Sequence, residues 1–180
     1  MMKMISIIHR FDCFILLYIK DNMHGIIMDK VMVISSYLGN DGIIWIIIAL
    51  ILIINKKYRR IGFMVLGALI LSFILDEGIL KHVFKRIRPS SVNLLIAKPL
   101  SYSFPSGHAT TSFAVAGVLA KHFSKYRFCF FSLAFLIAFS RLYLYVHYPT
   151  DILAGIVLGL ICSKIVIYLF NKAKHNKAAI

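Results

Sequence analysis

The chain has 180 residues, 60% of them hydrophobic and 16% charged, and carries 21 Lys and Arg against 7 Asp and Glu. Soluble domains are nearer half apolar and a quarter charged, so this chain has too few polar groups to cover its own surface. An integral membrane protein is predicted, and a disordered chain, a collagen-like repeat and a disulfide mini-scaffold are excluded. The formal charge of +14 fits a membrane surface or a phosphate-bearing substrate better than nucleic acid, because the basic residues lie between apolar runs.

The fold class predicted is an all-α, six-helix membrane bundle with an N-terminal interfacial helix. Apolar runs recur between short polar segments, and each extends into its flanks to roughly 18 to 22 residues. Residues 1–22 have an apolar side interrupted by His9, Arg10 and Asp12, which indicates a helix lying at the membrane surface and no signal peptide. We expect one domain over 1–180, with membrane helices in 23–171 and a cytoplasmic tail at 172–180. The six helices are expected near 23–39, 41–56, 60–82, 105–122, 126–145 and 150–171.

The distribution of basic residues predicts the orientation. Six crossings would place both termini on one side, together with 13 of the 21 Lys and Arg, whereas six basic residues would lie on the opposite side. Because cytoplasmic loops are rich in Lys and Arg, both termini are expected in the cytoplasm and the opposite end at the outer face of the cell membrane. In the last helix, Gly155 and Gly159 are expected to let another helix of the same chain approach closely.

Three polar stretches fall on the outward side of this arrangement. They are Lys81-x6-Arg88-Pro89, Pro105-Ser106-Gly107-His108 and Ser140-Arg141-x5-His147-x3-Asp151. Arg forks and a Lys charge can bind phosphate oxygens and counter the charge that spreads over them in phosphoryl transfer. Ser106 and Gly107 open a helix after Pro105, so free backbone N–H groups there could face an oxyanion.

The two histidines of these stretches have different surroundings. Asp151 follows His147 by four residues, with Pro149 starting a helix between them, so the carboxylate can orient the imidazole and leave its other nitrogen as a nucleophile. His108 has no carboxylate at such spacing and is the better general acid. No set of metal ligands is visible, and Cys13, Cys129 and Cys162 form no Cys-x-x-Cys pair, so neither a cofactor nor a metal is expected.

These three stretches resemble the signature motifs of the type 2 phosphatidic acid phosphatase (PAP2) family, which includes the lipid phosphate phosphatases. All eleven specified positions are present, in order, over residues 81–151. The resemblance implies a six-helix fold, a phosphohistidine formed on His147 and proton donation by His108. It also implies a phosphate site built from Lys81, Arg88, Ser106, Gly107 and Arg141. Two departures from the family pattern are Tyr145, where many members carry a small residue, and Ser90-Ser91.

The expected activity is metal-independent phosphatase action on a membrane lipid phosphate or diphosphate, with undecaprenyl diphosphate of the cell-wall carrier cycle as the first candidate. Phosphatidylglycerophosphate and phosphatidate phosphatases, a lipid phosphotransferase and a non-enzymatic binding or transport protein remain alternatives. No obligate protein partner is expected. Glu77, four residues before Lys81, is a candidate ion-pair partner that would hold this lysine, and Asp76 beside it has no assigned role.

Overall fold

The computed structural model describes residues 2–89 and 95–178, and all regular structure within them is helical. The predicted all-α class is therefore confirmed. Each predicted membrane segment contains a helix at nearly the expected bounds. These are α2 (Ile26–Gly39), α3 (Ile43–Ile54), α4 (Arg59–Phe73), α6 (Gly107–His122), α7 (Arg127–Tyr143) and α8 (Pro149–Ala178).

The helix predicted over 60–82 is built from three consecutive parts. α4 runs into the π-helical segment η2 (Ile74–Leu80), which runs into α5 (Lys81–Phe84). A π-helical turn inserts an extra residue into a helix and is found frequently at functional sites. Here the π-helical segment contains Asp76 and Glu77 and comes directly before Lys81. The extra residue per turn changes the direction in which these three side chains leave the helix.

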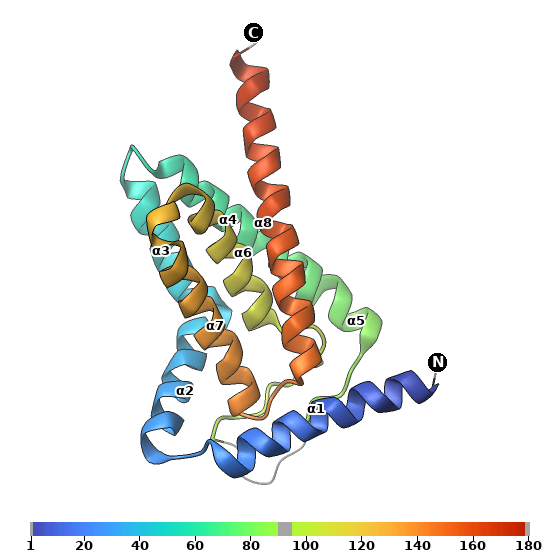
Figure 1. The fold of residues 1–180 in the computed structure, drawn as a ribbon. Helices are drawn as coiled ribbons and strands as arrows, with labels where there is room; N and C mark the ends of the chain where they lie inside the picture. Colours follow the sequence, from blue (N-terminus) through green and yellow to red (C-terminus); the bar gives the residue numbers. More distant parts are fainter. Residues whose placement is uncertain (1, 90–94, 179–180) are drawn as a thin grey trace.

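α2 and α3 join differently from the expected hairpin. They run end to end as one helical segment, Ile26–Ile54, kinked at the short 3-10 turn η1 (Asn40–Gly42) (Figure 1). Asp41 has φ 50° and Gly42 has φ 70°, and these two left-handed residues bend the helix without reversing the chain. The break expected between the helices at 23–39 and 41–56 is therefore a kink within one span.

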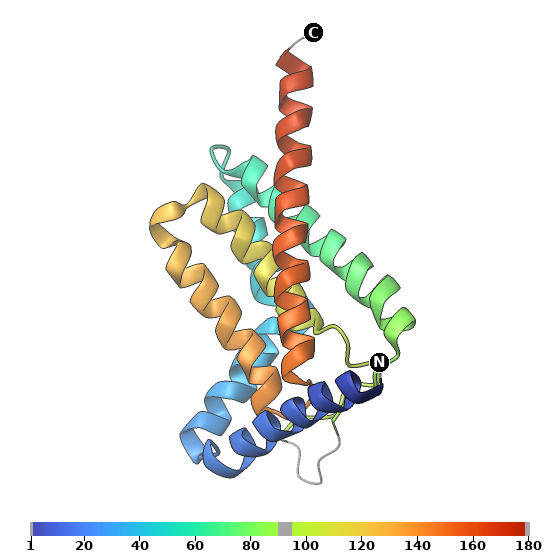
Figure 2. The same cartoon turned by 45° about the vertical axis from the view of Figure 1, so that its right-hand side comes forward.

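This difference moves the N-terminus to the other end of the bundle. α1 (Met2–Asn22) lies across the end of the bundle where α2 begins and α7 ends, as expected of an interfacial helix, while α8 ends at the opposite end (Figures 1 and 2). The sequence predicted both termini on one side, whereas in the fold α1 and the last turns of α8 lie at opposite ends of the bundle, because the merged α2–α3 removes one pass through it.

The core forms around α6, which packs against α4, α7 and α8. A Cβ placed on Gly155 would lie 2.8 Å from the carbonyl oxygen of Ser106, and one on Gly159 would collide with that of Thr110. These two glycines therefore bring α8 against α6, which confirms the predicted close approach within the chain. Ala114, Val115 and other small apolar residues of α6 are fully buried.

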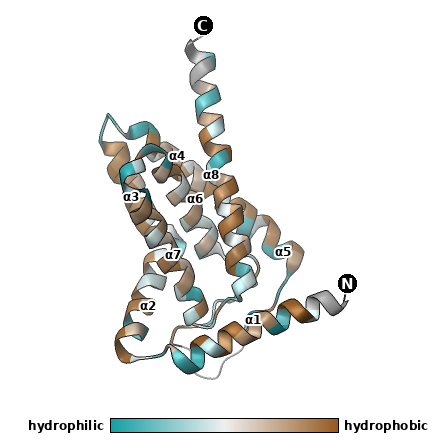
Figure 3. Ribbon diagram, in the orientation of Figure 1, coloured by the Kyte–Doolittle hydropathy of each residue, from teal (hydrophilic) through white to brown (hydrophobic). Residues whose placement is uncertain are grey.

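The outer surfaces of the bundle are apolar, which supports a membrane setting. Many exposed residues of the helices are Ile, Leu, Val and Phe, and hydrophobic stretches, coloured brown, recur along the helices in Figure 3. Within residues 2–89 and 95–178, four helical segments are long and apolar enough to cross a membrane, while α6 is 16 residues long and lies largely inside the bundle. The segments are Ile26–Ile54, Arg59–Phe84, Ser124–Tyr143 and Pro149–Ala173.

Candidate active site

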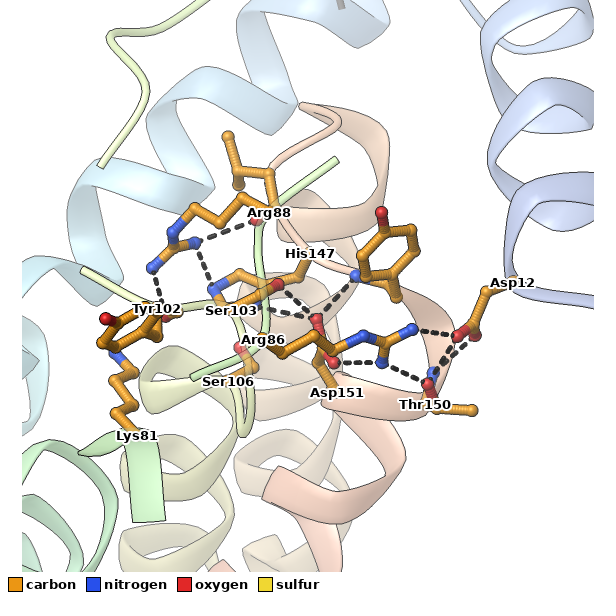
Figure 4. A network of polar contacts seen from close by, with 12 residues as sticks. Asp12, Lys81, Arg86, Arg88, Tyr102, Ser103, Ser106, His147, Thr150 and Asp151 are labelled. Carbon is orange, nitrogen blue, oxygen red and sulfur yellow. Dashed lines mark hydrogen bonds and ion pairs between the residues drawn. The ribbon is translucent and has the colours of Figure 1, made fainter. Parts of the chain in front are cut away.

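The three predicted motifs meet at the end of the bundle that α1 covers (Figures 1 and 4). His147 lies in the turn between α7 and α8 and is 2% exposed. Its Nδ1 is 3.5 Å from Oδ2 of Asp151, in the first turn of α8. The i,i+4 pair expected from the sequence is therefore present, although the distance is longer than that of an ordinary hydrogen bond.

Arg88 occupies the other side of the imidazole. Its Nη1 donates to Nε2 of His147 over 2.8 Å and to the carbonyl oxygen of Val146 over 2.9 Å. Its remaining donors bind the backbone and hydroxyl of Ser101 and the carbonyl of Tyr102. Because Nε2 accepts this hydrogen bond, it carries the lone pair, and the ring proton belongs on Nδ1, facing Asp151.

Asp151 is held by groups that the motifs do not include. Oδ2 accepts from the hydroxyl of Ser103 at 2.5 Å and from the N–H of Tyr148 at 2.9 Å. Oδ1 accepts from Nη1 of Arg86 at 2.6 Å (Figure 4). Sequence reasoning assigned no role to Ser103 or Arg86. Both residues are far from Asp151 in the chain, so no local sequence pattern could relate them to it.

Lys81 is enclosed by acids and a hydroxyl. Nζ is ion-paired with Glu77, lies 3.6 Å from Oδ2 of Asp76 and is 3.4 Å from the hydroxyl of Ser101. The ion pair expected between Glu77 and Lys81 is therefore present. Asp76 is 1% exposed, and neither of its oxygens has a hydrogen-bond partner. An uncompensated buried carboxylate is costly, so Lys81 offsets charge from two neighbours at once.

The start of α6 differs in one respect from the expectation. The N–H of Ser106 donates to the backbone oxygen of Asp151 over 3.1 Å, so it is not free for an oxyanion. The hydroxyl of Ser106 is buried without a partner. The N–H groups of Gly107 and His108 begin the helix and have no acceptor within it. A Cβ on Gly107 would lie 2.7 Å from Oδ2 of Asp76, so only glycine fits there.

His108 and Arg141 both face the end of α2. Nε2 of His108 is 3.0 Å from Oδ1 of Asn40 and 3.3 Å from the backbone oxygen of Ser36. Both neighbours are acceptors, so Nε2 carries a proton. Nη1 of Arg141 donates to the hydroxyl of Ser36, and its Nε is buried without a partner. Asn40 and Ser36 have no counterpart in the motifs and could not be chosen from sequence.

The electrostatic surroundings of His147 favour the neutral imidazole. Burial, and then the positive charges of Arg88, Arg141 and Lys81, hold the pKa of His147 well below its usual value. A neutral imidazole with its lone pair on Nε2 is the nucleophilic form. The same three cations provide the positive potential that a phosphate requires.

A cavity of about 360 Å³ opens beside the site, between the α2–α3 kink, α4 and α6. Ile46, Leu69 and Phe73 are among its apolar lining residues, whereas Gly107 and His108 form part of its polar end. The lining thus combines apolar residues with polar and acidic ones, among them Asp76 and Glu77. Among the described residues, no three His, Cys, Asp or Glu are placed to hold a metal ion.

Of the two departures from the family pattern, Tyr145 and Ser90-Ser91, only Tyr145 lies within the described residues. Tyr145 has φ 60°, a left-handed conformation in which small residues are favoured and a bulky side chain is strained. Ser90-Ser91 lies outside the described residues.

Helical architecture, three converging motifs and a cationic pocket around a buried histidine define a membrane phosphatase-like site. The PAP2 superfamily model matches residues 57–175, and the chain belongs to this superfamily. An undecaprenyl-diphosphatase of Sulfolobus acidocaldarius is 34% identical over 137 residues, which are 73% of this chain and 66% of that relative. The matched region therefore spans just under two thirds of the relative's length.

The solved structures that share the fold include two that match most of this chain. The first transmembrane PAP2-type phosphatidylglycerolphosphate phosphatase from Bacillus subtilis superimposes with a TM-score of 0.72 at 26% identity, over 91% of this chain and 87% of that one. LpxE of Aquifex aeolicus gives 0.71 at 28% identity, over 88% and 95%. The predicted family and fold are thus confirmed.

Proposed function

We propose that this protein is a membrane phosphatase that removes phosphate from a lipid phosphate or diphosphate through a phosphohistidine on His147. The observation that carries the proposal is the buried imidazole held between two groups, with Asp151 on its Nδ1 side and Arg88 on Nε2. A binding or transport protein has no need of an oriented nucleophile. The membership of the PAP2 superfamily supports the same activity.

The reaction follows from the donors and acceptors present. Nε2 of His147 attacks phosphorus as the bond to the leaving oxygen breaks, and the proton on His108 passes to that oxygen. Arg88, Arg141 and Lys81 bind the equatorial oxygens, with the Ser106 hydroxyl and the Gly107 N–H as further donors. Arg88 must then exchange its bond to Nε2 for one to phosphate. Water next attacks phosphorus and gives a proton back to His108 as the P–N bond breaks, so that His147 is regenerated and inorganic phosphate leaves. This scheme requires no metal or cofactor.

Undecaprenyl diphosphate is the proposed substrate. The cavity is lined both by apolar residues and by Gly107 and His108 at the start of α6, so a hydrocarbon chain lying in it could present its phosphate to the start of that helix. The undecaprenyl-diphosphatase relative supports this choice. Undecaprenyl phosphate and inorganic phosphate would be the products.

We further propose that the site faces outward. Ten Lys and Arg and no acid lie at the end where α8 finishes. The half of the bundle that holds the site also carries ten Lys and Arg, but these are accompanied by all seven Asp and Glu, and Lys81, Arg88 and Arg141 among them are buried. The end of α8 is therefore assigned to the cytoplasm, and α1 lies with the site at the outer surface. In this arrangement residues 1–180 form one domain. The ten are Lys56, Lys57, Arg59, Arg60, Lys121, Lys125, Arg127, Lys172, Lys174 and Lys177.

Phosphate release by the detergent-purified protein tests the activity. Undecaprenyl diphosphate, phosphatidylglycerophosphate and phosphatidate would be compared in the presence of EDTA, with His147→Ala as the control. Turnover that survives chelation and disappears in the variant is expected, with undecaprenyl diphosphate preferred. Phosphate that appears only when an acceptor lipid is added, bound to that lipid, would indicate a transferase. No turnover by folded protein on any of the three would reject the proposal.

A further inference from the structure

Asp12 on α1 is a fully buried carboxylate that lies outside all three motifs. Its side chain is 0% exposed, although α1 lies on the outside of the bundle, across the end where α2 begins (Figure 1). Leu16 and Ile19, four and seven residues later, are also buried, whereas Phe14 and Tyr18 are exposed. The inward face of the helix therefore carries a charged residue together with apolar ones, while aromatic residues face outward. A buried charge of this kind requires a partner.

The partner of Asp12 is Arg86. Oδ2 of Asp12 accepts from Nη2 of Arg86 over 2.6 Å and from the hydroxyl of Thr150 over 2.7 Å, and Oδ1 accepts from the Thr150 N–H over 3.0 Å. Both oxygens are thus engaged, and the carboxylate caps the start of α8, where negative charge is favourable. These hydrogen bonds connect α1 to Thr150, the residue before Asp151.

Arg86 joins Asp12 to the catalytic pair. Its Nη1 donates to Oδ1 of Asp151 and to the Thr150 hydroxyl, and its guanidinium lies 4.0 Å from the ring centroid of Tyr148 (Figure 4). Burial alone would lower the pKa of Arg86, but its bonds to Asp12 and Asp151 raise it. The cation therefore stays charged between the two carboxylates, and one guanidinium edge faces each of them.

We propose that Asp12 is a positioning residue for the proposed phosphatase reaction. Through Arg86 and Thr150 it fixes Asp151 and keeps the Asp12–Arg86–Asp151 group at a net charge of −1. As the imidazole of His147 attacks phosphorus it gains positive charge, which this group stabilises. α1 thereby becomes part of the catalytic apparatus, and turnover depends on its seating against α8. The inference rests on the proposed function.

Asp12→Asn is the direct test, because it removes the charge while keeping the shape. We expect kcat to fall about 10- to 100-fold, with KM little changed because Asp12 touches no substrate-binding group. Removing a negative charge also makes the potential at His147 more positive, where Arg88, Arg141 and Lys81 already face it. The acid limb of the kcat/KM profile should therefore move to lower pH.

The controls separate positioning from simple support of the fold. Asp21→Asn removes an acid from an exposed position on the same helix and should leave kcat, KM and the pH profile unchanged. Asp12→Glu keeps the charge and should retain the wild-type position of the acid limb. If Asp12→Asn does not yield folded protein, Thr150→Val removes one hydroxyl between Asp12 and Arg86 without isolating a charge, and kcat should still fall.

Three results would overturn the inference while the wild-type enzyme remains active. They are wild-type kcat in Asp12→Asn, a lower kcat with no movement of the acid limb, and, where Asp12→Asn does not fold, wild-type kcat in Thr150→Val. The second would assign Asp12 a structural role alone. Absence of turnover in wild-type protein is a different result, because it rejects the proposed phosphatase activity itself.

Discussion

The guanidinium of Arg88 donates a hydrogen bond to Nε2 of His147, the nitrogen proposed to attack phosphorus. The same guanidinium binds the carbonyls of Ser101, Tyr102 and Val146, so its position is set by the backbone of two separate segments. Because Arg88 donates to Nε2, that nitrogen must carry the lone pair of the imidazole. The same guanidinium is already positioned to bind a phosphate oxygen next to the nucleophile. The predictions below follow from this arrangement and from the close packing around it.

Arg88→Lys should abolish most activity. An ammonium group cannot make the forked set of contacts that Arg88 makes, so we expect kcat to fall at least about 100-fold. Lys98→Gln, which removes an exposed cation from the same connecting segment, should retain wild-type rates. Phosphate release at saturating substrate measures both. Equal rates for Arg88→Lys and wild type would contradict a role in transition-state binding.

The pH profile should report the low pKa of His147. Since the pKa of His147 is held below its usual value of about 6.5, the nucleophile stays neutral at lower pH, and the acid limb of kcat/KM should lie below pH 6.5. Arg141→Gln removes one of the cations responsible, so it should move that limb to higher pH while lowering kcat/KM. Movement in the opposite direction would mean that another group controls the limb.

Glu77→Gln should weaken substrate binding by loosening Lys81. The pair is partly exposed, with 36% of the Glu77 side chain accessible, so a modest effect of about two- to fivefold on KM is expected. Asp76 remains near Lys81 and limits the loss. Inhibition by inorganic phosphate gives an independent measure of the same site. Unchanged KM and phosphate affinity would mean that Glu77 does not position Lys81 for phosphate binding.

Gly107→Ala should inactivate the enzyme because the added methyl group would meet Oδ2 of Asp76 at 2.7 Å. Either Asp76 or the start of α6 has to move, which displaces the backbone donors proposed to bind phosphate. Gly78→Ala is the matched control, since a Cβ there has no neighbour within 4 Å. Turnover assays of both variants, alongside a check of folding, distinguish local displacement from general damage.

Gly159→Ala should destabilise the bundle more than the site. The new Cβ would collide with the carbonyl of Thr110 and come within 2.9 Å of the Ala114 nitrogen, forcing α8 away from α6. Overpacking of this kind costs about 1–3 kcal/mol, visible as a lower Tm in detergent. Gly67→Ala, whose nearest neighbour would be at 3.5 Å, should melt like wild type.

The sequence alone determined the membrane class, the helical segments and the residues of the three motifs. His147 and Asp151 could be paired because four residues and a helix-starting proline bring them together locally. Glu77 and Lys81 could be paired for the same reason. Contacts between residues four apart depend only on the local helix or turn, so spacing and composition are enough to predict them without knowing how distant segments pack.

Only the tertiary structure decided how α2 meets α3 and which residues support Asp151. Asn40-Asp41-Gly42 is compatible with a turn or a kink, and packing against α6, α4 and α7 selects the kink. Asp12 and Arg86 are 74 residues apart in the chain, and no local pattern relates them. Their ion pair forms because the folded bundle brings α1 and the segment after α5 to the same end, where the buried carboxylate of Asp12 requires a cationic partner.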